Sequence, residues 1–428
     1  MQAASPASPA SPTLHPLSEP PPRGPLVATL LAQVAFGLLA MTICLPSMQQ
    51  WGAIFGASQA RVQLTFSGYV VAFGALQLLY GPLSDRLGRR RVLLAGLALT
   101  VLGSLLGALA TDLTTLTAAR VLQGAGTAAG TVVGRALVQD LFQGPDRTRV
   151  MGWVGMTMGL CPPTATLVGG YVHVHLGWQG NFVLIGVLSL LLMAAAMRWL
   201  PDPPARHDAA AEAAATAASI PASTVAPWWG GLLSSYARLT REPSFLLYVA
   251  VLALTTAAFY AFLSGAPLVL GSEGVGPDRI GWYILFVPLA YIAGNFITTH
   301  LVRRWGEQPI MWTGQALTVC ALVPVLGLGL AGLHTPLAFA APLLLLGIGH
   351  GLLMPPTLAG TVGVVPALAG AAAAVGGVMQ QLMGAAGAYA VGWFSHQGPV
   401  NLAGLMLFFT ALAALAQVML FRRSTPRV

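Results

Sequence analysis

Long apolar runs alternate with short polar links from residue 26 to residue 421 of the chain. Each run holds about twenty residues, the length that a helix needs to cross the hydrocarbon core of a bilayer. Because backbone polar groups inside a bilayer must pair within their own segment, such runs predict helices. The pattern therefore predicts an all-α membrane protein with twelve transmembrane helices. The predicted spans are 26–48, 62–82, 92–111, 115–138, 148–171, 181–200, 245–266, 279–301, 310–331, 337–358, 370–392 and 400–421.

A polar interruption at residues 201–243 divides the predicted spans into two sets of six. Residues 26–200 hold the first set and residues 244–421 the second, so we expect two pseudo-symmetric six-helix bundles joined by a cytoplasmic central loop. Residues 1–25 are rich in Pro, Ser and Ala, which predicts a disordered tail. That tail lacks the basic region and apolar core of a signal peptide. Residues 422–428 are predicted to form a short cytoplasmic tail.

Composition supports a membrane protein and excludes a soluble globule. Hydrophobic residues make up 56% of the chain, charged residues 7%, and the mean hydropathy is +0.75, whereas roughly a quarter of a soluble domain is charged. The net charge of +8 comes from 20 basic residues, all of them arginine. Only Arg61 and Arg279 fall in predicted outer loops and Arg120 falls within a span, so the positive-inside rule predicts that both termini are cytoplasmic. The charge therefore indicates orientation in a bacterial inner membrane, not a nucleic-acid partner.

A dense charge cluster joins the second and third predicted spans. Its glycines permit tight turns, and Asp85 is a lone carboxylate among arginines that can accept charge-assisted hydrogen bonds or cap the next helix. Two interpretations stay open: the arginines only enforce topology, or the loop is a conformational latch between helices. The candidate latch residues are Gly81, Asp85, Arg86, Gly88, Arg89 and Arg90.

Arg120 lies inside the fourth predicted span, only about five residues from its outer end. An arginine within the membrane is costly, so we expect it to face a polar cavity or a polar partner. Gln123 follows one turn later on the same helix face, so the two side chains are predicted neighbours in a transport or coupling site. The alternative is that Arg120 snorkels to the outer interface.

The fifth predicted span combines proline with spaced glycines. Pro162 removes a backbone hydrogen bond and bends the helix. Gly159, Gly169 and Gly170 allow another helix to approach closely. The alternative explanation is the general enrichment of Gly and Pro in transmembrane helices.

Three of these strings resemble motifs of the major facilitator superfamily. Residues 81–91 are similar to its cytoplasmic loop signature, residues 120–126 to the Arg-x-x-Gln-Gly-x-Gly pattern of its proton-coupled transporters, and residues 159–170 to the antiporter signature of its drug exporters. Together with the strings 135–142 and 351–355, they make the chain resemble the bicyclomycin and chloramphenicol resistance (Bcr/CflA) exporters. The resemblance implies a twelve-helix drug:proton antiporter in which the charged loop is an inter-helix latch.

One departure from that family concerns the first span. The family usually carries an acidic residue just before a Leu-Pro pair, and here Thr42 takes its place ahead of Leu45-Pro46. The other acidic residues all fall in predicted loops, tails or helix ends, so the ordinary buried proton carrier is missing. His350 lies in the middle of the tenth span among glycines, where an imidazole could titrate near physiological pH and substitute for it. A neutral, hydrogen-bonded histidine is the alternative.

The predicted function is secondary active export of lipophilic drugs or similar small amphiphiles in exchange for protons, by alternating access. The alternative is a metabolite exporter or facilitator without conventional proton coupling. Since no acid is buried, neutral or anionic substrates are favoured over large cations, with Arg120 as the positive group. A central cavity between the halves is expected to be lined by Tyr69, Gln77, Tyr260, Tyr291, Asn295, Gln380 and Gln381.

Other classes of protein lack their motifs here. The sequence has no Gly-x-Ser-x-Gly and no His-Glu-x-x-His, so it is predicted not to be an enzyme. A phosphate loop needs a lysine, which the chain does not contain. The Cys and His spacings fit no metal site, so neither a metal nor a cofactor is expected. The expected partners are the lipid bilayer, a small lipophilic substrate and protons, and the expected state is a monomer.

Overall fold

The computed structural model describes residues 23–201, 237–365, 368–395 and 398–424, and these ranges are helical with no strand. Most of the predicted disordered tail, central loop and C-terminal tail lies outside the described residues. The predicted tail 1–25, central loop 201–243 and C-terminal tail 422–428 each overlap a helix at one edge, because α1 starts at Arg23, α10 starts at Pro243 and α16 continues to Ser424. These boundaries are corrected accordingly.

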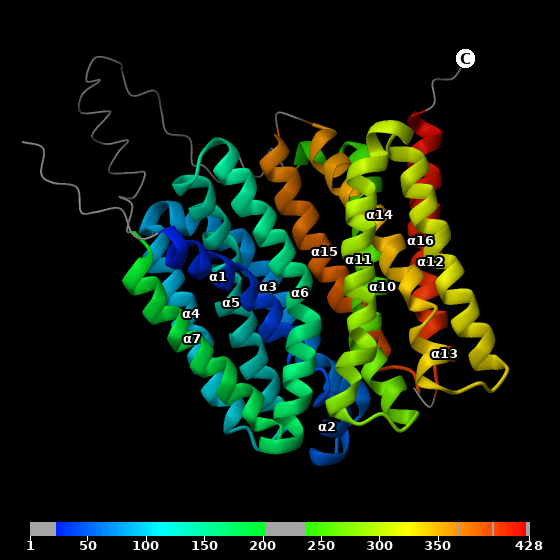
Figure 1. Cartoon of the computed structure of the whole chain (residues 1–428), viewed down its shortest axis with the longest axis horizontal. Coiled ribbons are helices and arrows are strands. Elements are labelled where there is room, and N and C mark those ends of the chain that lie inside the picture. The colour runs from blue at the N-terminus through cyan, green and yellow to red at the C-terminus, as the bar shows by residue number, and fades with distance from the viewer. Residues whose placement is uncertain (1–22, 202–236, 366–367, 396–397, 425–428) are drawn as a thin grey trace, which may run out of the picture.

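Two sets of helices make up the described chain, as the colours of Figure 1 show. The N-terminal set is α1 (Arg23–Thr42), α2 (Met48–Ile54), α3 (Gln59–Leu87), α4 (Arg89–Ala108), α5 (Leu113–Leu141), α6 (Gly144–Leu176) and α7 (Gln179–Trp199). The C-terminal set is α10 (Pro243–Ser272), α11 (Pro277–Trp305), α12 (Glu307–Leu330), α13 (Pro336–Ala340), α14 (Leu343–Gly363), α15 (Ala369–Val391) and α16 (Val400–Ser424).

Most of these helices match the predicted spans in length. Of the helices given above, α2 and α13 are short, with 7 and 5 residues, and each of the others has at least 20. Nine segments there are both long and apolar enough to cross a membrane, with α13 and α14 joined as one. The long helices α5, α6 and α15 carry more polar or small residues and fall outside that set. The chain is a multi-pass, all-helical membrane protein.

The predicted span 26–48 is not one continuous helix, because α1 ends at Thr42 and a turn precedes α2. Pro46 explains the break, since it has no N–H to donate to the carbonyl of Thr42. The Leu45 N–H donates to that carbonyl instead, at 3.1 Å. The last carbonyls of α1 are therefore free to take other donors.

Close packing in the two halves is similar. In the N-terminal half, a Cβ on Gly124 of α5 would collide with the main-chain oxygen of Tyr69 in α3. In the C-terminal half, a Cβ on Gly347 of α14 would collide with the main-chain oxygen of Val287 in α11. Glycine at these points lets helices approach closely without a soluble protein's hydrophobic driving force.

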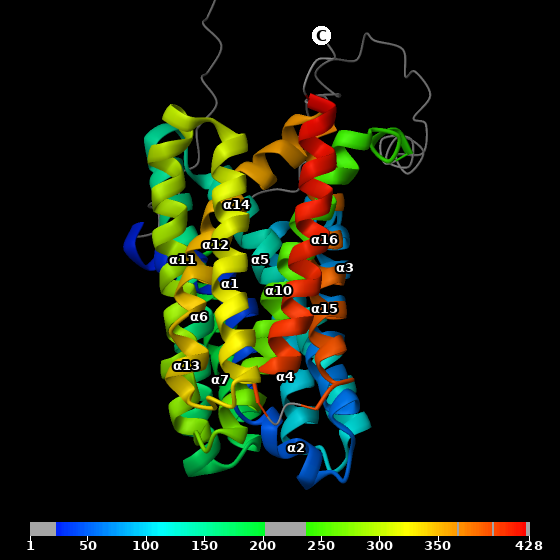
Figure 2. The same ribbon diagram turned by 90° about the vertical axis from the view of Figure 1, so that its right-hand side faces the viewer.

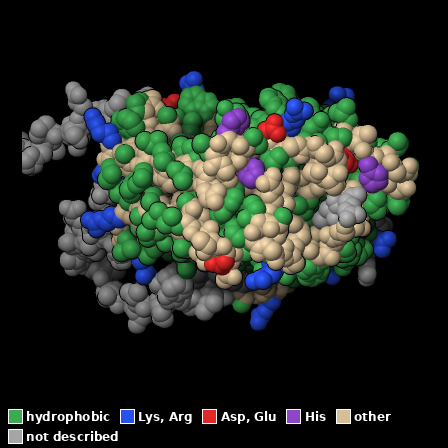
Figure 3. Space-filling view, turned by 90° about the horizontal axis from the view of Figure 1, so that it is seen from below, with side chains coloured by type: hydrophobic (Ala, Val, Ile, Leu, Met, Phe, Trp, Pro, Cys, Tyr) green, Lys and Arg blue, Asp and Glu red, His purple; other side chains and the backbone are tan. Residues whose placement is uncertain are grey.

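The bundle has two distinct ends in Figures 1 and 2. We call the end at which α1 begins and α16 finishes the termini end, and the opposite end, where α2 lies, the α2 end. Figure 3 looks onto the α2 end, where apolar and uncharged side chains dominate the surface and charged ones are scattered.

Contact between the halves through α3 and α15 extends from the α2 end to the middle of α3. A Cβ on Gly392 would collide with Ala60, and one on Gly74 would stand 2.6 Å from the Gln381 side chain. Positions 60, 74 and 81 of α3 recur at multiples of seven residues and so share one face. A Cβ on Gly81, nearest the termini end, would meet nothing within 4 Å.

Contact through α6 and α11 follows the same gradient. A Cβ on Gly170 would collide with the carbonyl oxygen of Pro277, and one on Gly159 would stand 3.1 Å from the Ile292 side chain. One turn nearer the termini end, a Cβ on Gly155 would meet open space. Both helix pairs therefore close the α2 end and diverge toward the termini end.

Candidate functional site

Arg120 is 1% exposed and caps the broken end of α1. Its Nη1 donates to the carbonyl oxygen of Ala40 at 2.7 Å, and its Nη2 donates to that of Met41 at 3.0 Å. These carbonyls end α1, where the helix dipole is negative. The prediction that Arg120 faces a polar partner therefore fits the geometry, and snorkelling to an interface does not. The positive charge is met by main-chain oxygens, not by a carboxylate.

A continuous hydrogen-bonded chain extends this cap across three helices. Arg120 Nη1 also donates to Gln123 Oε1 at 2.9 Å, as the one-turn spacing predicts. Gln123 Nε2 donates to Ser104 Oγ in α4 at 2.9 Å, and that hydroxyl donates to the Thr100 carbonyl at 2.8 Å. Both Gln123 and Ser104 are buried. Since buried polar groups must be paired, the chain fixes the position of the guanidinium.

Tyr69 belongs to this network and not to a substrate cavity on the present geometry. The Arg120 Cζ lies 4.4 Å from the centroid of its ring, a cation–π contact. Its hydroxyl donates to the Gly37 carbonyl at 2.7 Å and lies 2.6 Å from Thr127 Oγ1. The side chain is fully buried. The sequence marked Tyr69 as a polar aromatic residue within a span, but it gave no sign that Tyr69 would contact Arg120.

Thr42 lies where the family resemblance implies an acid. Its hydroxyl donates to the Leu38 carbonyl at 2.9 Å and is 3.4 Å from the Pro162 carbonyl of α6. Thr166 Oγ1 donates to the same Pro162 oxygen at 2.8 Å. Thr42 therefore joins the last turn of α1 to α6 through neutral groups. A hydroxyl used in this way cannot take over the proton transfer of a carboxylate.

The predicted glycines of α6 lie against other helices. A Cβ on Gly169 would collide with the Ile43 carbonyl in the turn after α1, while Gly170 meets α11 as described above. The Asn181 amide of α7 donates to the Gly169 carbonyl and to Ser47 Oγ, both at 3.1 Å. The α2 end of α6 thus connects the α1–α2 turn, α7 and the other half. Nothing in the sequence pattern singled out Asn181 or Ser47.

His350 is 2% exposed and lies between helices of the C-terminal half. Its ring is 6.0 Å from that of Phe259 in α10, in an edge-on arrangement. Among the described residues no hydrogen bond joins it to another side chain or to the main chain. The alternative of a histidine hydrogen-bonded to a facing helix is thus not what the geometry gives.

The remaining cavity candidates lie in separate places. The Tyr260 hydroxyl donates to Gln381 Oε1 at 3.1 Å, and the Asn295 amide donates to the Tyr291 carbonyl at 3.0 Å. Gln381 also packs against Gly74 at the contact between the halves. Gln77 of α3 and Gln380 of α15 are half-buried. Tyr260 and Gln381 therefore belong to the closed part of the interface.

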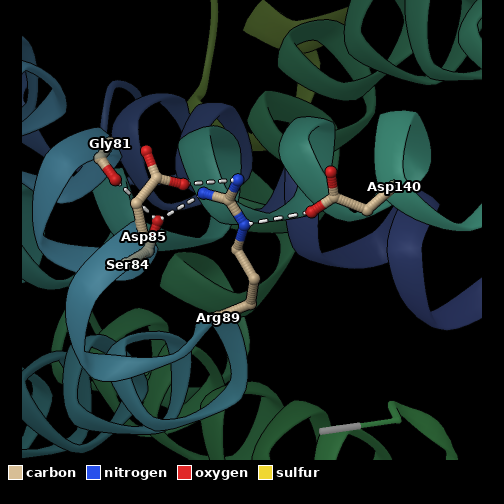
Figure 4. Close-up of polar contacts among 5 residues, drawn as sticks. All are labelled: Gly81, Ser84, Asp85, Arg89 and Asp140. Atoms are coloured by element: carbon tan, nitrogen blue, oxygen red, sulfur yellow. Dashed lines mark hydrogen bonds and ion pairs between the residues drawn. The ribbon is translucent and has the colours of Figure 1, made fainter. Parts of the chain in front are cut away.

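The charged segment 81–91, predicted as a loop, is helical except at Gly88, and it holds three helices together (Figure 4). Arg89 Nη2 pairs with Asp85 Oδ1 at 2.6 Å, and Arg89 Nε pairs with Asp140 Oδ2 at the end of α5 at 3.2 Å. Arg89 Nη1 also donates to Ser84 Oγ at 2.7 Å, and that hydroxyl donates to the Gly81 carbonyl at 2.9 Å. Asp140 and Ser84 were not predicted as members, because only the fold brings the end of α5 here.

The other latch candidates surround this cluster. Gly88 has φ +95° between α3 and α4, a conformation that only glycine adopts easily. Arg90 donates to the Met197 carbonyl near the end of α7, and Arg86 is exposed. The described contacts of Asp85, Arg89 and Asp140 all lie within the N-terminal half.

Long membrane-spanning helices in two halves, in contact at one end and parted at the other, are typical of a polytopic membrane transporter. The chain belongs to the major facilitator superfamily, whose model matches residues 27–388. It is 31% identical to a chloramphenicol resistance protein of Pseudomonas aeruginosa over 331 residues, 76% of this chain and 74% of that protein. It is 28% identical to multidrug resistance protein D of Escherichia coli over 364 residues, 83% and 86% of the two chains.

Further comparisons agree with this family. A bicyclomycin resistance protein homolog of Haemophilus influenzae is 25% identical over 296 residues, 66% of this chain and 69% of that protein. The resemblance to the Bcr/CflA exporters is thereby confirmed. Among solved structures, an inward-facing and unoccupied bacterial homologue of the human lysosomal transporter Spinster has a TM-score of 0.70 at 14% identity. The match covers 94% of this chain and 98% of that one, and it shows the shared fold.

Proposed function

We propose that this protein exports small lipophilic compounds across a bacterial inner membrane in exchange for protons, by alternating access. The observation that carries the proposal is the gradient of contact between the halves, closed from Gly392 to Gly74 and open at Gly81. A carrier of this kind needs an interface that can close at either end around one site. The curated relatives named for chloramphenicol and multidrug resistance support drugs as substrates.

The orientation that fits this proposal places the termini end in the cytoplasm. The arginines of the charged segment follow the end of α3 that is farthest from α2 and so lie at the termini end, and a cytoplasmic excess of arginine follows the positive-inside rule. The described conformation would then admit substrate from the cytoplasm. The latch of Asp85, Arg89 and Asp140 would tie α3, α4 and α5 into one unit that moves as the halves rock.

His350 is the proposed proton carrier, since Thr42 is neutral and Arg120 is paired with neutral groups. It is a titratable side chain buried inside the C-terminal half without a hydrogen-bond partner in the described structure. A histidine can exchange a proton between pH 5 and 8. The second candidate function, a metabolite exporter or facilitator without conventional coupling, is favoured by the neutral Thr42.

The test uses purified protein in liposomes with an acidic lumen and measures chloramphenicol accumulation. We expect accumulation that collapses when the pH gradient is dissipated and that is lost in Arg120→Ala. His350→Gln should transport without responding to the gradient, while His300→Gln, at an exposed position near the end of α11, should behave as wild type. Transport by the wild type that ignores the gradient would support the uncoupled carrier and contradict the antiporter.

A further inference from the structure

A second arginine within the spans, Arg135 of α5, differs from Arg120 in its surroundings. Thr131, one turn earlier on the same helix, donates to the Val34 carbonyl of α1, so this part of α5 faces α1. The Arg135 side chain leaves α5 beside α1 and reaches across to α6. There its Nη2 lies 3.1 Å from the sulfur of Met158.

The pairing of Arg135 is poor for a guanidinium. A thioether is a weak acceptor, and a guanidinium offers five N–H donors. The sulfur of Met158 is the only polar contact of Arg135 in the described structure. The donors of Arg120, by contrast, meet three oxygens. A half-buried cation without an anionic partner is costly to hold inside a span, and such residues mark functional sites.

The location of Arg135 is where the two halves part. Met158 is next to Gly159, the last glycine of α6 that touches α11, and three residues from Gly155, which faces open space. Arg135 itself keeps part of its surface accessible. A ligand entering between the halves from the termini end would reach this guanidinium.

The described membrane spans contain no carboxylate that could pair with Arg135. The carboxylates in the described ranges all lie in loops or in the first or last turns of helices: Asp85, Asp112, Asp140, Asp146, Glu242, Glu273, Asp278 and Glu307. No side chain within the spans therefore balances Arg135. A lipophilic cation would be repelled here, while a carboxylate or sulfonate would form a charge-assisted, bidentate pair.

We propose that Arg135 binds the acidic group of the substrate and that the preferred substrates are lipophilic organic monoanions. This inference rests on the proposed exporter function and specifies its substrate class. Met158 then holds the guanidinium in place when no substrate is bound. An arginine is suited to this role because its planar fork matches a carboxylate.

The test measures binding to the purified protein in neutral detergent, by energy transfer from tryptophan to a dansyl group. The probes are dansylglycine, which carries a carboxylate, and its neutral amide, which has the same body. We expect the wild type to bind dansylglycine at least tenfold more tightly than the amide. Arg135→Gln should bind the two equally, and Arg135→Lys should restore part of the preference. Arg198→Gln removes an exposed charge at the end of α7 and should keep the full preference.

Two outcomes separate this inference from the proposed function. Equal binding of the two probes by the wild type, or an unchanged preference in Arg135→Gln, would overturn the anion site even if chloramphenicol is transported. A preference that depends on Arg135, together with no transport of any probe in liposomes, would uphold the site and contradict the exporter.

Discussion

At the scale of single residues, the central feature is an arginine that stabilises a helix end. Arg120 is held by two carbonyls of α1, by Gln123 and by the face of Tyr69. A helix broken by proline leaves such carbonyls without main-chain donors, and a buried guanidinium has N–H donors that need acceptors. The contact between Arg120 and α1 satisfies both groups. The arginine is thus structural for α1 as well as a candidate for coupling.

Arg120→Lys should lower both the melting temperature and chloramphenicol transport. A lysine carries its donors on one point and cannot reach two carbonyls and an amide while it stacks on a ring. Each hydrogen bond to a charged group contributes about 1.5–3 kcal/mol, so transport should fall at least tenfold. The control Arg279→Lys changes a side chain that is 78% exposed and should alter neither quantity. Wild-type stability in Arg120→Lys would contradict the capping role.

The sequence predicted part of this network. The spacing of Arg120 and Gln123 fixes them on one helix face, and that prediction is confirmed. The other acceptors are main-chain atoms of α1, which carry no sequence signal until the break at Pro46 is known. Asp140 escaped notice for a similar reason, since only the fold brings the end of α5 to Arg89.

Glu273, just after α10, gives a pH-dependent prediction. Both of its carboxylate oxygens are buried without a hydrogen-bond partner in the described structure. Burial raises the pKa of this carboxyl above its ordinary value of 4.5, and nearby His334 partly offsets the rise. A raised folded-state pKa means that stability is full below pH 4.5 and decreases as the pH climbs through the folded-state pKa. Ionised Glu273 therefore destabilises the fold at neutral pH.

Glu273→Gln should accordingly raise the melting temperature at pH 7 and leave it unchanged at pH 4. The matched control is Asp112→Asn at the start of α5. There hydrogen bonds from Thr115 and Thr114 lower the pKa of the carboxyl, so loss of its charge should lower the melting temperature at pH 7. A lower melting temperature for Glu273→Gln at pH 7 would mean that the carboxylate has a partner when ionised.

At the scale of helices, α6 and α11 show how glycines determine where the two halves can come into contact. Gly170 lies so near the main chain of Pro277 that no side chain fits, whereas a Cβ on Gly159 would stand 3.1 Å from the side chain of Ile292, a tight contact with a side chain and not with the backbone. The sequence correctly marked these glycines as close-approach positions, but it could not say which helix they approach. That partner is in the other half, more than 100 residues away in the chain.

Gly170→Ala should weaken closure of the α2 end and reduce chloramphenicol transport at least tenfold. The new methyl group would have to displace the main chain of Pro277, which cannot give way as a flexible side chain could. The control Gly404→Ala, in α16, adds a methyl group in open space and should leave transport unchanged. Normal transport by Gly170→Ala would show that contact at this point is dispensable.

At the scale of the whole molecule, the pattern of apolar runs predicted more of the structure than the individual polar and charged residues did. Run lengths and the interruption at 201–243 yielded the long helices and their division into two sets, since the bilayer constrains both. The sequence did not predict which end of the molecule is closed, because one face of α3 contacts α15 at Gly74 but has no neighbour within 4 Å at Gly81. Which end closes depends on contacts between distant segments, not on local pattern.

The central claim is that the two ends open in turn, and distances between spin labels test it most directly. One pair, Gly152→Cys with Thr299→Cys, reports the termini end, and the other, Ser58→Cys with Ser395→Cys, reports the α2 end; all four positions are exposed. The exposed Cys320 is replaced by Ser, while Cys44 and Cys161 are buried. Measurements are made in liposomes at pH 8 and pH 5.5, with and without chloramphenicol. Alternating access predicts that the first distance shortens as the second lengthens. Distances that stay fixed under every condition, or that change together, would contradict it.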